Sequence, residues 1–99
     1  MTDDNFQRYV ILLSKLPDKS DTLEIIREHV AYIRSLDDRG ILVLAGPFLD
    51  YRGGMVIIKA ASLDEADGIA LTDPFVIHGV RNFEIRTWQL STRENNYLL

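Results

Sequence analysis

The sequence of 99 residues contains no cysteine. Disulfide bonds and thiolate metal ligands are therefore excluded, and so is a small secreted scaffold held together by disulfides. No apolar run approaches the roughly 20 residues that a membrane-spanning helix requires. The opening residues MTDDNFQRYV begin acidic and contain neither a basic region nor an uninterrupted apolar core, so we predict that they are not a signal peptide. Together these absences favour a cytoplasmic protein with no membrane partner.

Runs of lysine or arginine are also missing, and 11 basic residues against 15 acidic ones give a net charge of −4. Nucleic acids are bound through basic patches, so we expect no nucleic-acid partner. The chain has the composition of a folded protein, with 46% apolar and 26% charged residues. The length predicts a single domain over residues 1–99, with a core at about 6–90 and a C-terminal tail at 91–99.

Apolar and turn-forming residues alternate along the chain in a definite order. Segments rich in Val, Ile and aromatic residues, as is typical of strands, lie at 6–14, 41–45, 55–60 and 82–90. A first helix is expected to begin with Asp21 as its N-terminal cap and to end at Gly40. A second is expected to begin at Ser62 and to end before Pro74, because the residue preceding a proline is disfavoured in a helix. The order β-α-β-β-α-β predicts an α+β, ferredoxin-like fold.

The first predicted helix carries an apolar stripe that we expect to face the sheet. Its large apolar residues recur at the helical period: Leu23, Ile26, Val30, Ile33 and Leu36. His29 falls within the same apolar half of the helix. Taken alone, a histidine in such a position is more often a core residue than a catalytic one.

The strands predict a second copy of the chain. In this fold both helices cover one face of the sheet, so the strands should alternate between apolar and polar residues. Residues 9–13, 41–45 and 55–58 are instead apolar at consecutive positions. Because monomers rarely tolerate a large exposed apolar face, we predict a homodimer packed sheet against sheet. The alternative cover, the tail at 91–99, is too short and too polar.

Asp73 is the residue that gives His29 a possible chemical role. Helices on the same face of the sheet can bring the end of the second helix close to the middle of the first. A carboxylate that accepts from one imidazole nitrogen fixes the tautomer and leaves the other nitrogen as a general acid or base. Asp73 is also well suited to cap a short turn that Pro74 opens and Gly79 closes. The two roles are compatible.

Other residues are weaker candidates for a binding site. Ser14 ends the first strand, where its hydroxyl can donate into a cleft, and Gly46-Pro47 permits a close approach of the backbone to a ligand. With Phe75 they form the predicted substrate-binding set. His78 has no carboxylate at ligand-like spacing, so we predict no metal site.

Several of these features occur together in one family. They are His29, Gly40, Ala45-Gly46-Pro47-Phe48, Gly53-Gly54, the helix start at 62–66, Asp73-Pro74-Phe75 and Gly79. In order and spacing the chain resembles the YCII (YciI-like) family from about Tyr9 to Trp88. The resemblance implies a dimeric α/β-barrel with a ferredoxin-like fold and an active site built on a His–Asp pair, here His29 and Asp73. Family members often carry an arginine three residues before the histidine, where this chain has Ile26.

The resemblance also implies a class of chemistry. A few members look like cofactor-free lyases acting on breakdown products of chlorinated aromatics, and the muconolactone isomerases of similar fold also move protons. Our hypothesis is an enzyme without cofactors in which His29, oriented by Asp73, transfers a proton during isomerisation or elimination on a small organic molecule. No motif for a hydride-transfer cofactor and no nucleophile with a paired base is evident. The alternatives are a ligand-binding or regulatory module of the same fold, or a structural subunit with a buried His–Asp bond.

Overall fold

The computed structural model describes residues 6–99. Residues 1–5, which carry the acidic start used to argue against a signal peptide, lie outside the described residues. The elements are β1 (Gln7–Lys15), α1 (Leu23–Asp38), β2 (Leu42–Pro47), β3 (Gly53–Ile58), α2 (Leu63–Leu71), α3 (Pro74–Ile77), β4 (Arg81–Gln89) and the 3₁₀ segment η2 (Arg93–Leu98).

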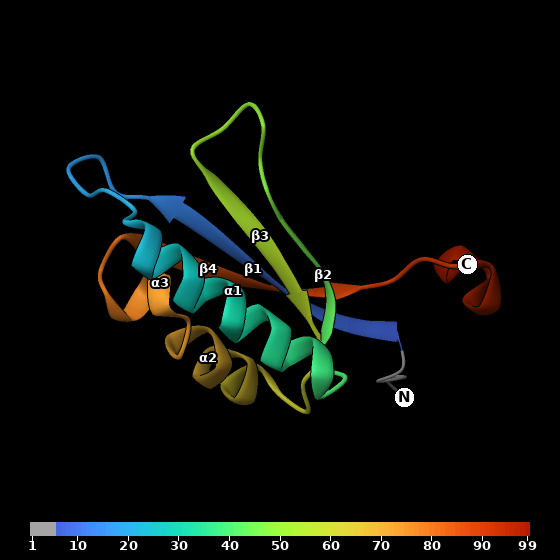
Figure 1. The fold of residues 1–99 in the computed structure, drawn as a ribbon. Coiled ribbons are helices and arrows are strands. Elements are labelled where there is room, and N and C mark those ends of the chain that lie inside the picture. Colours follow the sequence, from blue (N-terminus) through green and yellow to red (C-terminus); the bar gives the residue numbers. More distant parts are fainter. Residues whose placement is uncertain (1–5) are drawn as a thin grey trace.

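The strands form one four-stranded antiparallel sheet in the order β2-β3-β1-β4. Helices α1, α2 and α3 lie together on one side of this sheet (Figure 1). The predicted α+β, ferredoxin-like arrangement is thereby confirmed, and α3 is an additional single turn between α2 and β4. Within residues 6–99, no helix combines the length and the apolar character needed to cross a membrane.

The start of α1 differs from the prediction by one residue. Thr22 is the N-terminal cap, and its hydroxyl accepts from the backbone N–H of Ile25 at 3.1 Å. The prediction of Asp21 as the cap is therefore wrong. Threonine caps a helix nearly as well as aspartate, and this leaves the Asp21 carboxylate free to pair with Arg81.

Other predicted boundaries are confirmed. Gly40 follows α1 with φ of 72°, in the left-handed region that ends a helix. The Ser62 hydroxyl caps α2 by accepting from the backbone N–H of Glu65. Gly53 opens β3 so close to β1 that a Cβ there would lie 2.1 Å from the carbonyl oxygen of Leu13. The double glycine thus allows the end of the β2–β3 hairpin to approach β1.

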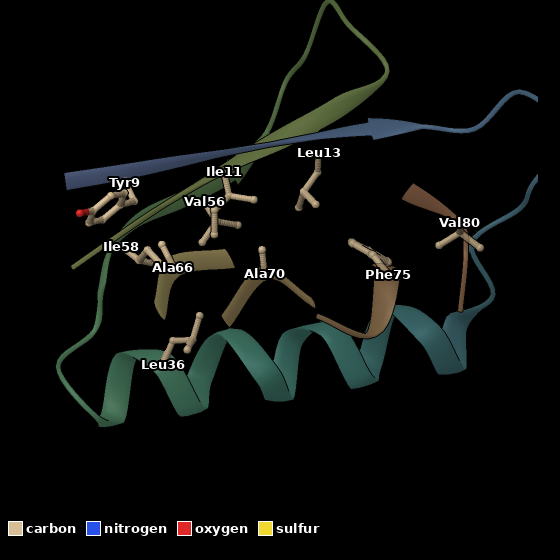
Figure 2. Close-up of a cluster of buried hydrophobic side chains, with 10 residues drawn as sticks. All are labelled: Tyr9, Ile11, Leu13, Leu36, Val56, Ile58, Ala66, Ala70, Phe75 and Val80. Carbon is tan, nitrogen blue, oxygen red and sulfur yellow. The ribbon is translucent and has the colours of Figure 1, made fainter. Parts of the chain in front are cut away.

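The hydrophobic core lies between the sheet and the helices (Figure 2). Its members come from every layer: Tyr9, Ile11, Leu13, Leu36, Val56, Ile58, Ala66, Ala70, Phe75 and Val80. Contrary to expectation, not all residues of the apolar stripe of α1 join this core. Leu36 is fully buried, whereas Ile26 and Val30 are 38% and 47% exposed. Ile26 and Val30 line a cavity instead.

The opposite face of the sheet is open and partly apolar. Successive strand residues point to opposite faces, so Val10 and Leu12 lie on this face while Ile11 enters the core. By their cross-strand pairing, Leu44 of β2 and Trp88 of β4 share it, with exposures of 67% and 46%. The C-terminal segment with η2 extends beyond the end of β4 and does not cover this face (Figure 1).

Candidate active site

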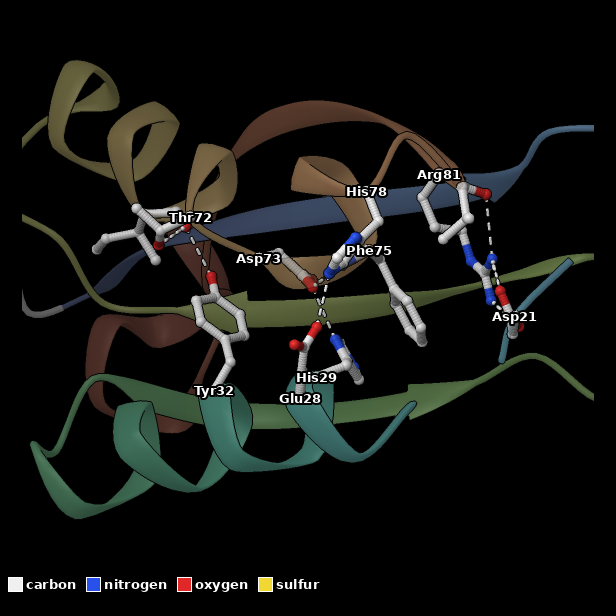
Figure 3. Close-up of polar contacts among 11 residues, drawn as sticks. Asp21, Glu28, His29, Tyr32, Thr72, Asp73, Phe75, His78 and Arg81 are labelled. Carbon is white, nitrogen blue, oxygen red and sulfur yellow. Dashed lines mark hydrogen bonds and ion pairs between the residues drawn. The ribbon is translucent and has the colours of Figure 1, made fainter. Parts of the chain in front are cut away.

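His29 and Asp73, 44 residues apart in the sequence, meet in a hydrogen bond of 2.8 Å between Nδ1 and Oδ1 (Figure 3). His29 projects from α1, and Asp73 precedes α3. An ionised carboxylate only accepts, so in the neutral imidazole Nδ1 carries the proton and Nε2 has the lone pair. The Asp73 side chain is 3% exposed and that of His29 is 17% exposed. The predicted contact is present, with the carboxylate behind the ring and the imidazole nearer to solvent.

Asp73 also caps α3. The same oxygen, Oδ1, accepts from the backbone N–H of Phe75 at 2.9 Å. Pro74 takes the first helical position, where its missing N–H costs nothing, and Gly79 with φ of 71° ends the turn. The cap fixes the carboxylate on the backbone of α3, so the position of His29 is tied to the turn.

Phe75 forms the middle of a three-membered stack. The His29 ring lies 4.0 Å from the Phe75 ring, with 17° between the planes. The guanidinium carbon of Arg81 lies 4.3 Å from the same ring centre. Two groups this close to one ring centre must occupy opposite faces, and Figure 3 shows Phe75 between them. Packing on Phe75 therefore fixes the plane of the imidazole, while Asp73 fixes its rotation.

Arg81 is held by Asp21, the residue expected to cap α1. Its two terminal nitrogens donate to the two carboxylate oxygens at 2.6 and 2.8 Å. The hydrogen bond from Arg81 lowers the pKa of Asp21 below 3.8, against the opposing effect of burial. The pair joins the start of β4 to the segment before α1, at the end of the sheet where His29 lies.

Tyr32, one turn after His29, is a neutral neighbour of the dyad. Its hydroxyl donates to the carbonyl oxygen of Ile69 at 2.7 Å. Burial, followed by the negative charge of Asp73, raises the pKa of Tyr32 to about 12. Tyr32 therefore stays protonated near neutral pH and remains a hydrogen-bond donor beside the dyad.

A second histidine pair lies nearby on the surface. His78 Nε2 is 2.6 Å from Glu28 Oε2, and the side chains are 42% and 44% exposed. Exposed ion pairs contribute little to stability, so this contact is a minor link between α1 and α3. Among residues 6–99, no three histidine or carboxylate side chains are grouped so that they could hold a metal ion.

A cavity of about 660 Å³ opens beside the dyad, between the first half of α1 and the β2–β3 hairpin. Four of the predicted site residues line it: His29, Gly46, Pro47 and Phe75. Asp73 lies behind His29 and does not line it. The structure does not bring Ser14 to the cavity, because the lining residues Leu13 and Lys15 point to the other face of β1.

The family follows from a comparison of sequences. The profile of the YCII-related domain matches residues 7–89. The chain belongs to this family. The uncharacterized protein YjpA of Bacillus subtilis (strain 168) is 32% identical over 82 residues, which are 83% of this chain and 96% of that protein.

Solved structures resemble this YCII-related domain in fold. A 5-chloro-2-hydroxyhydroquinone dehydrochlorinase, TftG from Burkholderia phenoliruptrix AC1100, was solved in complex with 2,5-dihydroxybenzoquinone. It matches with a TM-score of 0.67 and 23% identity, over 83% of this chain and 93% of that one. A muconolactone isomerase matches with a TM-score of 0.63 and 11% identity, over 86% of this chain and 88% of that one. At these identities the likeness establishes the shared fold.

Sequence reasoning missed several residues of the site in this YCII-related domain. Arg81, which stacks on Phe75, and the cavity-lining Lys15 and Arg52 were not singled out. One signal for Arg81 was available, since it is a charged residue directly after the apolar run that ends at Val80. Lys15 and Arg52 resemble ordinary strand-end charges, and only the fold brings them together.

Proposed function

We propose that this YCII-related domain is an enzyme that uses neither metal nor organic cofactor and transfers protons on a small organic molecule, as a lyase or isomerase. The observation that carries the proposal is the His29–Asp73 hydrogen bond at the wall of the cavity. Asp73 engages Nδ1, so Nε2 is the ring nitrogen that can act on a ligand. The protein would act in the cytoplasm.

In the proposed reaction a single imidazole, that of His29, transfers the proton. Nε2 of His29 removes a proton from a carbon next to a carbonyl group, and the electron pair of that C–H bond moves into the resulting enolate. Asp73 stabilises the imidazolium that forms. In an isomerisation the imidazolium returns the proton to another carbon of the enolate system. In an elimination the electron pair instead expels a leaving group, and the proton passes to solvent.

The two enzymes of similar fold support this reaction class. Their names describe an elimination, dehydrochlorination, and an isomerisation, each on a small organic compound. Their names also supply substrates for a test. Purified protein would be incubated with muconolactone and with 5-chloro-2-hydroxyhydroquinone, and the products followed by NMR in deuterated water. Incorporation of deuterium would report proton removal even where no net product forms.

Variants of the dyad decide whether His29 is the catalytic group. We expect His29→Gln to lower kcat by on the order of 10²–10⁴. Asp73→Asn should lower kcat far more than it changes KM. His78→Gln is the matched control, because it removes the exposed histidine that pairs with Glu28. Its activity should equal that of the wild type. Equal loss in both histidine variants would contradict the assignment, and ligand binding without turnover would favour the binding-module alternative.

We further propose that the protein is a homodimer packed through the open face of the sheet. The support is the apolar character of this face, including Leu12 and the exposed Leu44 and Trp88. Light scattering should give twice the 11.3 kDa mass of one chain. Leu12→Glu should yield monomers, whereas the same change at Leu63, 50% exposed on α2, should leave the dimer intact. A wild-type monomer would refute the proposal.

A further inference from the structure

The cavity beside His29 has a charge opposite to that of the protein. The whole chain carries −4, yet the charged residues that line the cavity are Lys15, Arg52 and Arg81 against Asp21 alone. Arg81 and Asp21 neutralise each other in their two-pronged pair. The remaining positive charge comes from Lys15 and Arg52. Charges that line a concave, partly apolar surface act more strongly on a ligand than the same charges on an open surface.

Lys15 and Arg52 are neighbours across two strands. The backbone N–H of Lys15 donates to the carbonyl oxygen of Arg52 at 3.1 Å, where the end of β1 meets the β2–β3 hairpin. The Lys15 ammonium lies 3.4 Å from a carboxylate oxygen of Asp21 that Arg81 already binds, so its own charge is poorly compensated. The Arg52 guanidinium makes no ion pair with any residue in the described range 6–99. Both cations can therefore bind a ligand.

The rest of the lining is largely apolar. Ile26, Val30 and Ile33 of α1 contribute one wall, and Pro47 and Val56 contribute to the hairpin side. Ile26 and Val30 remain partly exposed in a helix whose period would allow them to join the core. Apolar side chains kept beside a cavity are typical of a site for an organic ligand, with a few polar groups that fix its orientation.

We propose that the cavity is selective for small organic monoanions. The anionic group, a carboxylate or phenolate, binds Lys15 and Arg52, while the apolar body lies against α1 and reaches Nε2 of His29. The inference deepens the proposed function, on which its biological meaning rests, by naming the substrate class of the same site. A neutral analogue of the same shape loses the charge-assisted hydrogen bonds and should bind more weakly.

The test compares benzoate with benzamide, which share the apolar ring and differ in charge. Binding to the wild-type protein would be titrated by NMR at low ionic strength, following the ring signals of His29 and Phe75. We expect benzoate to bind about tenfold more tightly than benzamide, as one or two partly exposed charge-assisted contacts would give. Raising the salt concentration should weaken the binding of benzoate and leave that of benzamide nearly unchanged.

Substitutions locate the anion. The double variant Lys15→Met and Arg52→Met should lose the preference, so that benzoate and benzamide bind alike. The control pairs Arg34→Met with Lys59→Met. These residues are exposed outside the cavity, and the control changes the net charge by the same amount. It should keep the preference, which excludes an effect of total charge.

Each result bears on the proposal. Equal affinity for the two probes in the wild type, absence of binding by both, or a preference that survives the Lys15–Arg52 change would each overturn it. Neither probe can undergo elimination or isomerisation, so the titration measures recognition alone. A protein that prefers benzoate yet shows no turnover would refute the proposed enzyme and leave the anion site standing. Turnover without any preference for benzoate over benzamide would refute the anion site and leave the proposed enzyme standing.

Discussion

Replacing Asp73 with alanine removes a carboxylate oxygen that accepts two hydrogen bonds. Oδ1 accepts from Nδ1 of His29 at 2.8 Å and from the backbone N–H of Phe75 at 2.9 Å. The side chain is 3% exposed, so water cannot readily replace it. The substitution should therefore destabilise the fold through two separable losses, the cap of α3 and the bond to the histidine.

The size of the loss follows from these contacts. Loss of a helix cap costs about 1 kcal/mol of the free energy of unfolding. Loss of a hydrogen bond to a charged group costs about 1.5–3 kcal/mol, nearer the lower value here because the His29 ring is partly open to water. We expect a total of about 3 kcal/mol for Asp73→Ala.

Urea unfolding followed by the circular dichroism signal would measure this change. Protein concentration must be held fixed, since the stability of the proposed dimer would depend on it. Ser62→Ala is the control, because the Ser62 hydroxyl caps α2 through an exposed hydrogen bond from Glu65 and has no second partner among residues 6–99. It should cost about 1 kcal/mol. The difference between the variants, about 2 kcal/mol, estimates the contribution of the His29 contact.

A double-mutant cycle with His29→Ala isolates the pair. The two single substitutions and their combination should reveal a coupling energy of about 1–2 kcal/mol. If Asp73→Ala costs no more than Ser62→Ala and the coupling is zero, then Asp73 is only the cap of its turn. The bond to His29 would contribute no stability, and the argument that it holds the imidazole in one orientation would fail.

Two further predictions concern the ends of β4 and β3. Arg81 lowers the pKa of Asp21 below 3.8, so this pair stabilises the protein fully above that pH, and its contribution is lost as the pH falls through the lowered pKa. The free energy of unfolding of Asp21→Asn should therefore decline less than that of the wild type on acidification below pH 3.8. Urea unfolding would measure both, and equal pH profiles would contradict the prediction. Gly53→Ala places a Cβ 2.1 Å from the Leu13 carbonyl oxygen and should lower the free energy of unfolding by at least about 3 kcal/mol. Gly68→Ala, in a helix where a Cβ meets open space, should instead raise it by about 0.5–1 kcal/mol. Thermal melts would test both, and a tolerated Gly53→Ala would refute the close packing.

The sequence by itself determined the order of elements and the turn that carries Asp73. Strand and helix periods are local, and so are the residues that end each element, such as Gly40 and Pro74. Because the order of elements also implies which helices share a face of the sheet, the proximity of His29 to Asp73 was predictable. The cap of α3 was predictable too, since its donor and acceptor are two residues apart.

Only the tertiary structure decided what surrounds that pair. Hydropathy does not distinguish a side chain that packs in a core from one that borders a cavity, so the exposure of Ile26 and Val30 was not foreseen. The strand register placed Ser14 on the face away from the cavity, while Lys15 points into it. The partner of Asp21 lies 60 residues away at Arg81. Such contacts depend on the spatial distance between elements, and local sequence patterns carry no information about that distance.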